Sequence, residues 1–229
     1  MKTSNIICIY PSDQTTDFLS PIVKVLELYG ASIFRLQPND CPYNDIKRRI
    51  YESESGTLVF FLGHGADNRL YGAMVNGSKD IFVNSTENDI FNDKNIVLLA
   101  CKSNDFIQSY LTKKRTQYPP LNAIGFGILP TDWNDVIAER DGDAMAFNGI
   151  IEQDIDYFRT TLVQIFSSTI KYILDKGFSV KKFYTHIKLR LNKEIATLLT
   201  ERQKMHYSEI AALFHRVKEE VYFYSQDEN

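Results

Sequence analysis

Short apolar runs alternate with helix-like spacing through the first half of the chain. Within each run the apolar residues are continuous, which is typical of parallel strands that are covered on both faces. Between the runs, apolar residues recur at intervals that place them on one face of a helix. This order predicts parallel pairing with right-handed crossovers. We expect strands at 5–10, 32–36 and 57–62, and helices at 18–29 and 43–54.

A small hairpin is expected within residues 70–83. Asn76-Gly77 separates two strand-like runs there, and this dipeptide is the strongest short-range signal of a type I′ hairpin turn. A polar helix or loop at 84–94 then returns the chain to the sheet. The alternation continues with a strand at 95–100, a helix at 104–115 and a strand at 122–128.

The second half of the chain is mainly helical. Residues 130–156 are polar, and we expect a long loop there. Apolar stripes at helical spacing follow within a helical part at 157–220, and residues 221–225 are expected to form a last edge strand. The pattern predicts one α/β domain over 1–229, with a mostly parallel central sheet and helices on both faces.

Composition and charge narrow the class of protein. The 229 residues are 44% hydrophobic and 24% charged, which is typical of a globular domain. The net charge of -3 does not favour a nucleic-acid partner. No apolar run has the length expected of a membrane span or a signal peptide. The cysteines form no close pair, which indicates a reducing compartment and a cytoplasmic protein; they are Cys8, Cys41 and Cys101.

Two residues with side chains suited to catalysis follow predicted strands. His64 follows the run at 57–62, and Cys101 follows the run at 95–100. Because open parallel sheets form sites beyond the carboxyl ends of their strands, neighbouring strands would deliver imidazole and thiol to one crevice. The imidazole would activate the thiol, and the N-terminus of the next helix would favour the thiolate. The backbone N–H groups of Gly65 and Cys101 could form an oxyanion hole.

Each of the two residues also has an interpretation without chemistry. A cysteine at the end of an apolar strand usually belongs to the core, and a single histidine there can be incidental. The sequence contains no G-x-S-x-G elbow, phosphate-binding loop, dinucleotide motif, H-E-x-x-H or C-x-x-C pattern. His64 and Cys101 therefore remain the obvious catalytic pair, and their chemistry needs no metal or other cofactor.

The two motifs together resemble those of the caspase-like cysteine peptidases of clan CD, and most closely the CHAT group. "FFLGHG" is similar to the histidine block of that group, and "VLLACKS" is similar to its cysteine block. The hairpin between the blocks and the helices after the loop add to the resemblance, which covers roughly residues 5–200. It implies a three-layer caspase-like sandwich. It also implies His64 as general acid/base, Cys101 as the nucleophile that forms a thioester, and the Gly65 and Cys101 amides as the oxyanion hole.

The substrate residue before the cleaved bond, P1, is left open by this pattern. The interval from His64 to Cys101 is shorter than in caspases, and the caspase Q-A-C-x-G block is absent. A basic P1 residue would require a carboxylate in its pocket, and an acidic one would require Arg69 or Arg140. The candidate substrate-binding residues are Asp67, Asp105, Asp132 and Trp133.

The expected function is therefore that of a thiol protease, a hydrolase that cleaves a protein substrate. By resemblance it would be prokaryotic, would act in a regulated signalling or antiviral defence pathway, and would depend on a separate activator protein. One alternative is a catalytically silent caspase-like module that binds a partner. Another is an unrelated flavodoxin-like binding domain in which Cys101 is a core residue and His64 is incidental.

Overall fold

The computed structural model describes residues 6–11, 13–37, 42–75, 78–86, 89–113, 119–177 and 179–228. Within this part of the chain two compact units are found. The sheet unit comprises residues 1–127 together with 221–229, and the helical unit comprises residues 128–220. The assignment of 1–229 to a single domain stays a prediction.

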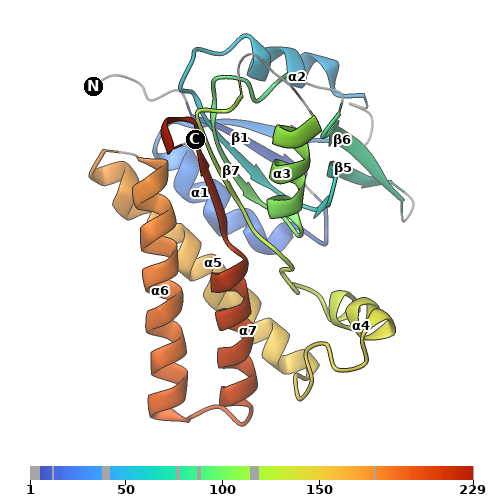
Figure 1. Ribbon diagram of the computed structural model, residues 1–229, viewed down its shortest axis with the longest axis vertical. Helices are drawn as coiled ribbons and strands as arrows, with labels where there is room; N and C mark the ends of the chain where they lie inside the picture. The colour runs from blue at the N-terminus through green and yellow to red at the C-terminus, as the bar shows by residue number, and fades with distance from the viewer. Residues whose placement is uncertain are drawn as a thin grey trace. The chain divides into compact units, whose positions relative to one another are not determined.

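A central sheet organises the sheet unit (Figure 1). Among the described residues its strands are β1 (Ile6–Pro11), β2 (Ser32–Leu36), β3 (Leu58–Leu62), β7 (Asn95–Leu99), β8 (Asn122–Gly125) and β9 (Tyr222–Ser225). Their order across the sheet is β2-β1-β3-β7-β8-β9. Neighbouring strands are parallel, except that β9 runs antiparallel to β8 at one edge. The expectation of a mostly parallel sheet with a C-terminal edge strand is confirmed.

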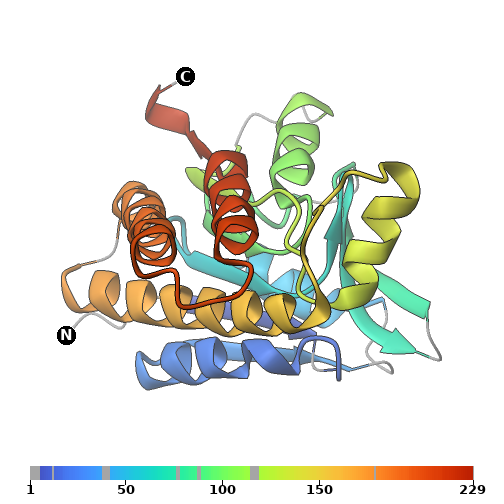
Figure 2. The ribbon, with the colours of Figure 1, turned by 90° about the horizontal axis from the view of Figure 1, so that it is seen from below.

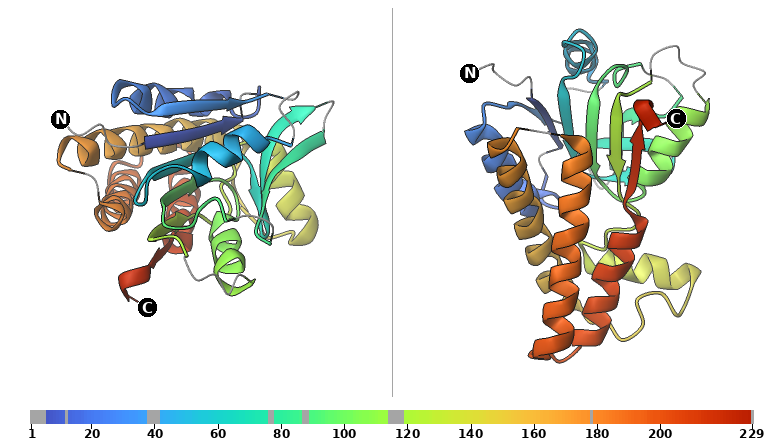
Figure 3. Two further views of the ribbon diagram at one scale, coloured as in Figure 1. Left: turned by 90° about the horizontal axis from the view of Figure 1, so that it is seen from above. Right: turned by 60° about the vertical axis from the view of Figure 1, so that its left-hand side comes forward.

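Helices lie on both faces of this sheet, as the sequence pattern predicts. They are α1 (Ser20–Leu28), which follows a short 3-10 turn at Asp17–Leu19, α2 (Asn44–Tyr51) and α3 (Ser103–Lys113). Figure 3 shows α1 on one side of the sheet and α3 on the other. α1 buries Ile22 and Leu26. Ile50 of α2 and Phe106 of α3 belong to one buried cluster with Val59 of β3, so α2 and α3 share the opposite face.

A smaller antiparallel sheet follows β3. It contains β4 (Gly65–Ala66), β5 (Arg69–Val75) and β6 (Ser78–Asn84). The hairpin expected within 70–83 is confirmed as β5 and β6, while its expected turn at Asn76 and Gly77 lies outside the described residues. Phe82 of β6 stacks on Phe61 of β3 with ring centroids 6.0 Å apart, which holds the small sheet against the central one. Between β6 and β7 the described residues form turns rather than a helix.

The helical unit consists mainly of long helices. Its described elements are α4 (Trp133–Gly142), α5 (Glu152–Asp175), α6 (Val180–Glu201) and α7 (Tyr207–Glu220). α6 and α7 pack side by side and α5 crosses them (Figure 2), with the rings of Phe158 and Phe214 4.8 Å apart. The helices expected from the three apolar stripes are confirmed. In the described part of the chain, no helix combines the length and apolar character that a membrane span requires.

The loop expected over 130–156 is wrong in part, because α4 lies within it. The sequence pattern misses this helix because Val136 is its buried residue and no apolar stripe marks the segment. A capping box starts the helix instead. The Asp132 carboxylate accepts the N–H of Asn134 at 2.8 Å, and the Asp135 carboxylate accepts the N–H of Asp132 at 3.1 Å.

Candidate active site

His64 and Cys101 emerge at the same edge of the central sheet. β3 and β7 are adjacent parallel strands with Leu62 opposite Leu99, and adjacent strands lie about 4.8 Å apart. The pairing continues beyond the strand ends, because the N–H of Gly63 donates to the carbonyl of Leu99 at 3.1 Å. His64 and Cys101 each stand two positions beyond the paired leucines. The two predicted catalytic residues are therefore carried by neighbouring strand ends, as the sequence pattern predicts.

The backbone after His64 packs tightly against the backbone of Cys101. A Cβ atom added to Gly65 would lie 2.6 Å from the Cys101 carbonyl oxygen and 3.1 Å from the Ala100 Cβ. Contacts this short with backbone atoms exclude any side chain, so the close approach requires glycine at this position. The two residues whose amides are predicted to form an oxyanion hole thus belong to adjoining segments, and their role stays a prediction.

The imidazole of His64 is half-buried and has a partner on a third strand end. Its Nε2 lies 2.5 Å from the Oγ1 of Thr15, in the loop that follows β1. Thr15 Oγ1 in turn donates to the Asp13 carboxylate at 2.6 Å. The sequence analysis missed both residues. The available signal was their place beyond the carboxyl end of the strand at 5–10, the same position that singles out His64.

Cys101 stands between β7 and α3, and its side chain is half-buried. Lys102 takes a left-handed backbone conformation with φ 53, and α3 begins at Ser103. The Ser103 hydroxyl makes two hydrogen bonds to the backbone at the ends of neighbouring strands. It donates to the carbonyl of Leu98 at 2.7 Å and accepts the N–H of Phe126 at 2.8 Å. This buried hydroxyl holds the end of β7 beside the end of β8, so the turn that presents Cys101 is fixed.

The free cysteines of the described residues, Cys8 and Cys101, have contrasting surroundings. Cys8 lies in the middle of β1 with 0% of its side chain exposed, and this burial raises the pKa of its thiol far above the ordinary value. Cys101 is partly accessible and adjoins the N-terminus of α3, whose partial positive charge favours a thiolate. Cys41 lies outside the described residues. Among the described residues, Cys101 is therefore the cysteine placed for nucleophilic chemistry.

A polar cavity of about 550 Å³ opens between the small sheet and α3. Its lining includes the carboxylates of Asp67 and Asp105, the guanidinium of Arg69 and the phenol of Tyr71. Lys102 Nζ is 4.0 Å from the exposed Asp67 carboxylate. Two of the four predicted substrate-binding residues are thus brought together beside segments that follow His64 and Cys101. Asp67 and Asp105 therefore face Arg69 in the lining and Lys102 beside it, so the cavity carries charges of both signs.

Asp132 and Trp133 belong to the helical unit. Asp132 caps α4, and the Trp133 ring carries the guanidinium of Arg140 at 5.1 Å from its centroid. Arg140 also donates to the backbone carbonyls of residues 146, 147 and 150. All three side chains therefore have structural partners within this unit, and a substrate-binding role for Asp132 and Trp133 stays a prediction.

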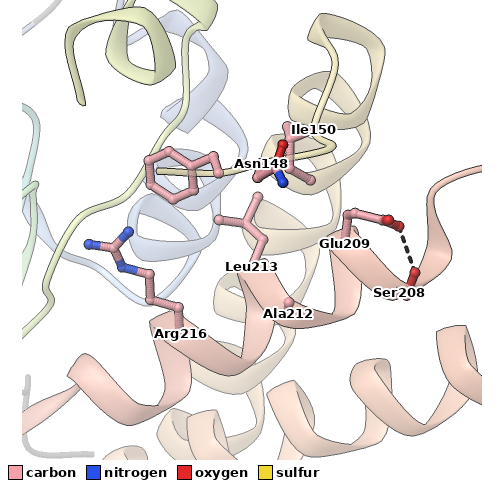
Figure 4. Close-up of a pocket in the computed structure, with 8 residues that line it drawn as sticks. Asn148, Ile150, Ser208, Glu209, Ala212, Leu213 and Arg216 are labelled. Carbon is pink, nitrogen blue, oxygen red and sulfur yellow. Dashed lines mark hydrogen bonds between the residues drawn. The ribbon is translucent and has the colours of Figure 1, made fainter. Parts of the chain in front are cut away.

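A second cavity, of about 390 Å³, lies within the helical unit (Figure 4). Phe147, Ile150 and Leu213 make it largely apolar, and the Arg216 guanidinium lies over the Phe147 ring at 4.9 Å. Neither a thiol nor an imidazole lines it, so it lacks both groups of the predicted catalytic pair. It is suited to binding an apolar group and not to the chemistry expected at the strand ends.

His206 forms a polar contact within the helical unit. It lies in the turn before α7, and its Nδ1 is 2.9 Å from the carboxylate of Asp154. The same carboxylate accepts the N–H of Ile151 at the start of α5. The pair therefore ties the turn to the beginning of α5, which is a structural contact within the helical unit.

Within the described part of the chain, no group of three or more His, Cys, Asp or Glu side chains is arranged to hold a metal ion.

Comparisons with known proteins add no family to this geometry. The sequence and fold were compared with protein-family models, with curated proteins and with solved structures, and none of them matches the chain.

Proposed function

We propose that the chain is a cysteine endopeptidase of the caspase-like kind, with Cys101 as the nucleophile and His64 as the general acid/base. The observation that carries this proposal is the parallel pairing of β3 with β7, which places both residues beyond adjacent strand ends. A thiol becomes an effective nucleophile when a nearby imidazole takes its proton. No other described cysteine combines access with such a neighbour, because Cys8 is fully buried.

The proposed reaction proceeds in two halves. His64 takes the Cys101 proton, and the thiolate attacks the substrate carbonyl to form a tetrahedral oxyanion facing the amides of Gly65 and Cys101. His64 then gives the proton to the leaving amine, and a thioester remains on Cys101. In the second half His64 takes a proton from water, which attacks the thioester. The acid product leaves, and the proton on His64 returns to the sulfur.

The substrate is proposed to be a protein whose side chain enters the polar cavity between the small sheet and α3. Its lining offers Asp67 and Asp105 to a basic P1 residue and Arg69 to an acidic one, and the labelling test decides between them. Cytoplasmic location, a separate activator protein and a part in antiviral defence follow from the resemblance alone, and they belong to the same proposal.

The test is covalent labelling with peptidyl acyloxymethyl ketones that vary in P1, read by intact-protein mass. We expect one probe adduct on the wild-type chain, with the preferred P1 residue giving the strongest labelling, and none on Cys101→Ala or His64→Ala. Cys8→Ala is the matched control, and it should label as the wild type does. Alkylation of Cys101 by iodoacetamide without labelling by any P1 probe, even with the activator protein present, would contradict the proposal and favour a silent binding module.

A further inference from the structure

We propose that Thr15 and Asp13 are positioning residues that hold His64 in the tautomer needed to activate Cys101. This inference rests on the proposed function of His64 and Cys101. It begins from two contacts in series: Thr15 Oγ1 lies 2.5 Å from His64 Nε2 and 2.6 Å from the Asp13 carboxylate. Both residues come from the loop after β1, the strand that pairs with β3 on its other side.

The direction of these hydrogen bonds follows from the chemistry of the three groups. An ionised carboxylate only accepts, so the single hydroxyl hydrogen of Thr15 is donated to Asp13. The Thr15 oxygen must then accept from His64, which places the hydrogen of a neutral imidazole on Nε2. The basic nitrogen of the ring is therefore Nδ1. In the proposed reaction, Nδ1 is the atom that takes the proton of Cys101.

The loop is braced so that the Thr15 hydroxyl has a defined position. Asp13 accepts the N–H of Thr15 at 2.9 Å and, through its second oxygen, the N–H of Met74 in β5 at 3.3 Å. The N–H of Thr16 donates to the Asp13 carbonyl at 3.0 Å, and the hydroxyl of the buried Tyr10 donates to the Thr16 carbonyl at 3.1 Å. The carboxylate is thus held by β5 and by its own loop.

The same contacts would stabilise the charged ring during the reaction. When Nδ1 takes the Cys101 proton, the positive charge spreads to Nε2–H, which donates to an oxygen polarised by the Asp13 carboxylate. Thr15 itself is exposed, so its side chain is not required for packing. A hydroxyl that is dispensable for the core, but linked to an imidazole on one side and a carboxylate on the other, points to a role in positioning.

The first test is direct observation of the His64 tautomer by NMR of the chain with ¹⁵N-labelled histidine, at a pH where the ring is neutral. His64→Ala assigns the resonances. We expect the Nε2–H form in the wild type and in Thr15→Ser, which keeps the hydroxyl, and a mixture of tautomers in Thr15→Val. An Nδ1–H form in the wild type, or an unchanged tautomer in Thr15→Val, would overturn the inference.

The second test is the pH dependence of Cys101 alkylation by iodoacetamide. Removing a hydrogen bond to a charged group should slow the reaction of Thr15→Val about tenfold at roughly pH 6–7. The difference should disappear near pH 10, where a thiol ionises without help. Thr15→Ser should react like the wild type, and Asp13→Asn should lie between the two. Thr185→Val is the matched control, because Thr185 is an exposed threonine whose hydroxyl donates to a carbonyl within α6.

The two tests separate this inference from the proposed function. If His64→Ala changes the alkylation profile but Thr15→Val does not, the catalytic pair stands and the positioning role fails. If Thr15→Val is slower by one constant factor at every pH, the role is merely structural and the inference also fails. If His64→Ala leaves the profile unchanged, the proposed function fails, and the tautomer then decides whether Thr15 orients the ring.

Discussion

The middle of the central sheet and its carboxyl edge give the same residue type opposite properties. Cys8 lies in the interior of β1, and Cys101 stands just beyond β7. Cys8 has no exposed surface. Cys101 is partly accessible, begins the turn into α3 and adjoins the strand end that carries His64. The position of a cysteine along its strand therefore decides whether it is a buried core residue or a candidate nucleophile.

The sharpest test of this comparison is the relative reactivity of the two thiols in the folded chain. Burial raises the pKa of Cys8, so its thiolate is scarce at neutral pH and reagent has no path to it. We expect iodoacetamide to modify Cys101 at least about 100-fold faster than Cys8 at roughly pH 7.5. Peptide mass spectrometry measures both rates in one sample, and in urea the two should become similar.

The raised pKa of Cys8 also gives a pH dependence with a definite sign. Below the pKa of an unfolded thiol, about 8.5, Cys8 is protonated in both states and its contribution to the free energy of unfolding is constant. Above that pH the Cys8 thiol ionises in the unfolded chain while it remains protonated in the folded chain, so this contribution is lost as pH rises.

Modification of Cys8 within tenfold of the Cys101 rate in the folded chain would remove the distinction between the two regions.

Most strands and helices could be predicted because short stretches of sequence specify them. Continuous apolar runs mark β1, β3 and β7, and a turn dipeptide between strand-like runs marks the hairpin. α4 escaped prediction because capping by Asp132 and Asp135 defines it, and no apolar stripe does. The cap follows from two side chains near one turn, and polar segments elsewhere in the chain contain similar residues without forming helices.

The candidate site divides in the same way. His64 and Cys101 could be predicted because each ends an apolar run, and parallel sheets gather such ends at one edge. Thr15 also follows a predicted strand, but its contact with His64 could not be predicted, because it depends on the pairing of β1 with β3 and on the path of the loop after β1. The Ser103 hydroxyl joins Leu98 to Phe126, and these two residues become neighbours only when β7 and β8 pair.

A smaller effect is expected from filling the close approach at Gly65. In Gly65→Ala the new methyl would lie 2.6 Å from the Cys101 carbonyl oxygen, and backbone cannot move aside cheaply. We expect the free energy of unfolding to fall by up to about 3 kcal/mol, and alkylation of Cys101 to slow as the two segments separate. Urea denaturation and iodoacetamide kinetics measure the two effects.

Gly142→Ala is the matched control for that substitution. An added Cβ at Gly142, the last residue of α4, meets no atom within 4 Å. Its stability should therefore be unchanged or slightly higher, since alanine favours helix over glycine. Equal effects of the two substitutions would mean that the tight contact between the His64 and Cys101 segments is absent in solution.

The smallest expected effect concerns the hydroxyl that fixes the turn at the sheet edge. Ser103 is fully buried and joins the ends of β7 and β8 through Leu98 and Phe126. Ser103→Ala removes both hydrogen bonds and should cost about 1–2 kcal/mol in the free energy of unfolding. Ser167 in α5 is the control, because within the described part of the chain its buried hydroxyl has no hydrogen-bond partner. Ser167→Ala should therefore be neutral or stabilising. Urea denaturation measures the free energy of unfolding of both variants. If Ser103→Ala is no less stable than Ser167→Ala, the sheet edge that presents Cys101 is held by packing alone. The distinction between edge and interior then rests on burial rather than on hydrogen bonds.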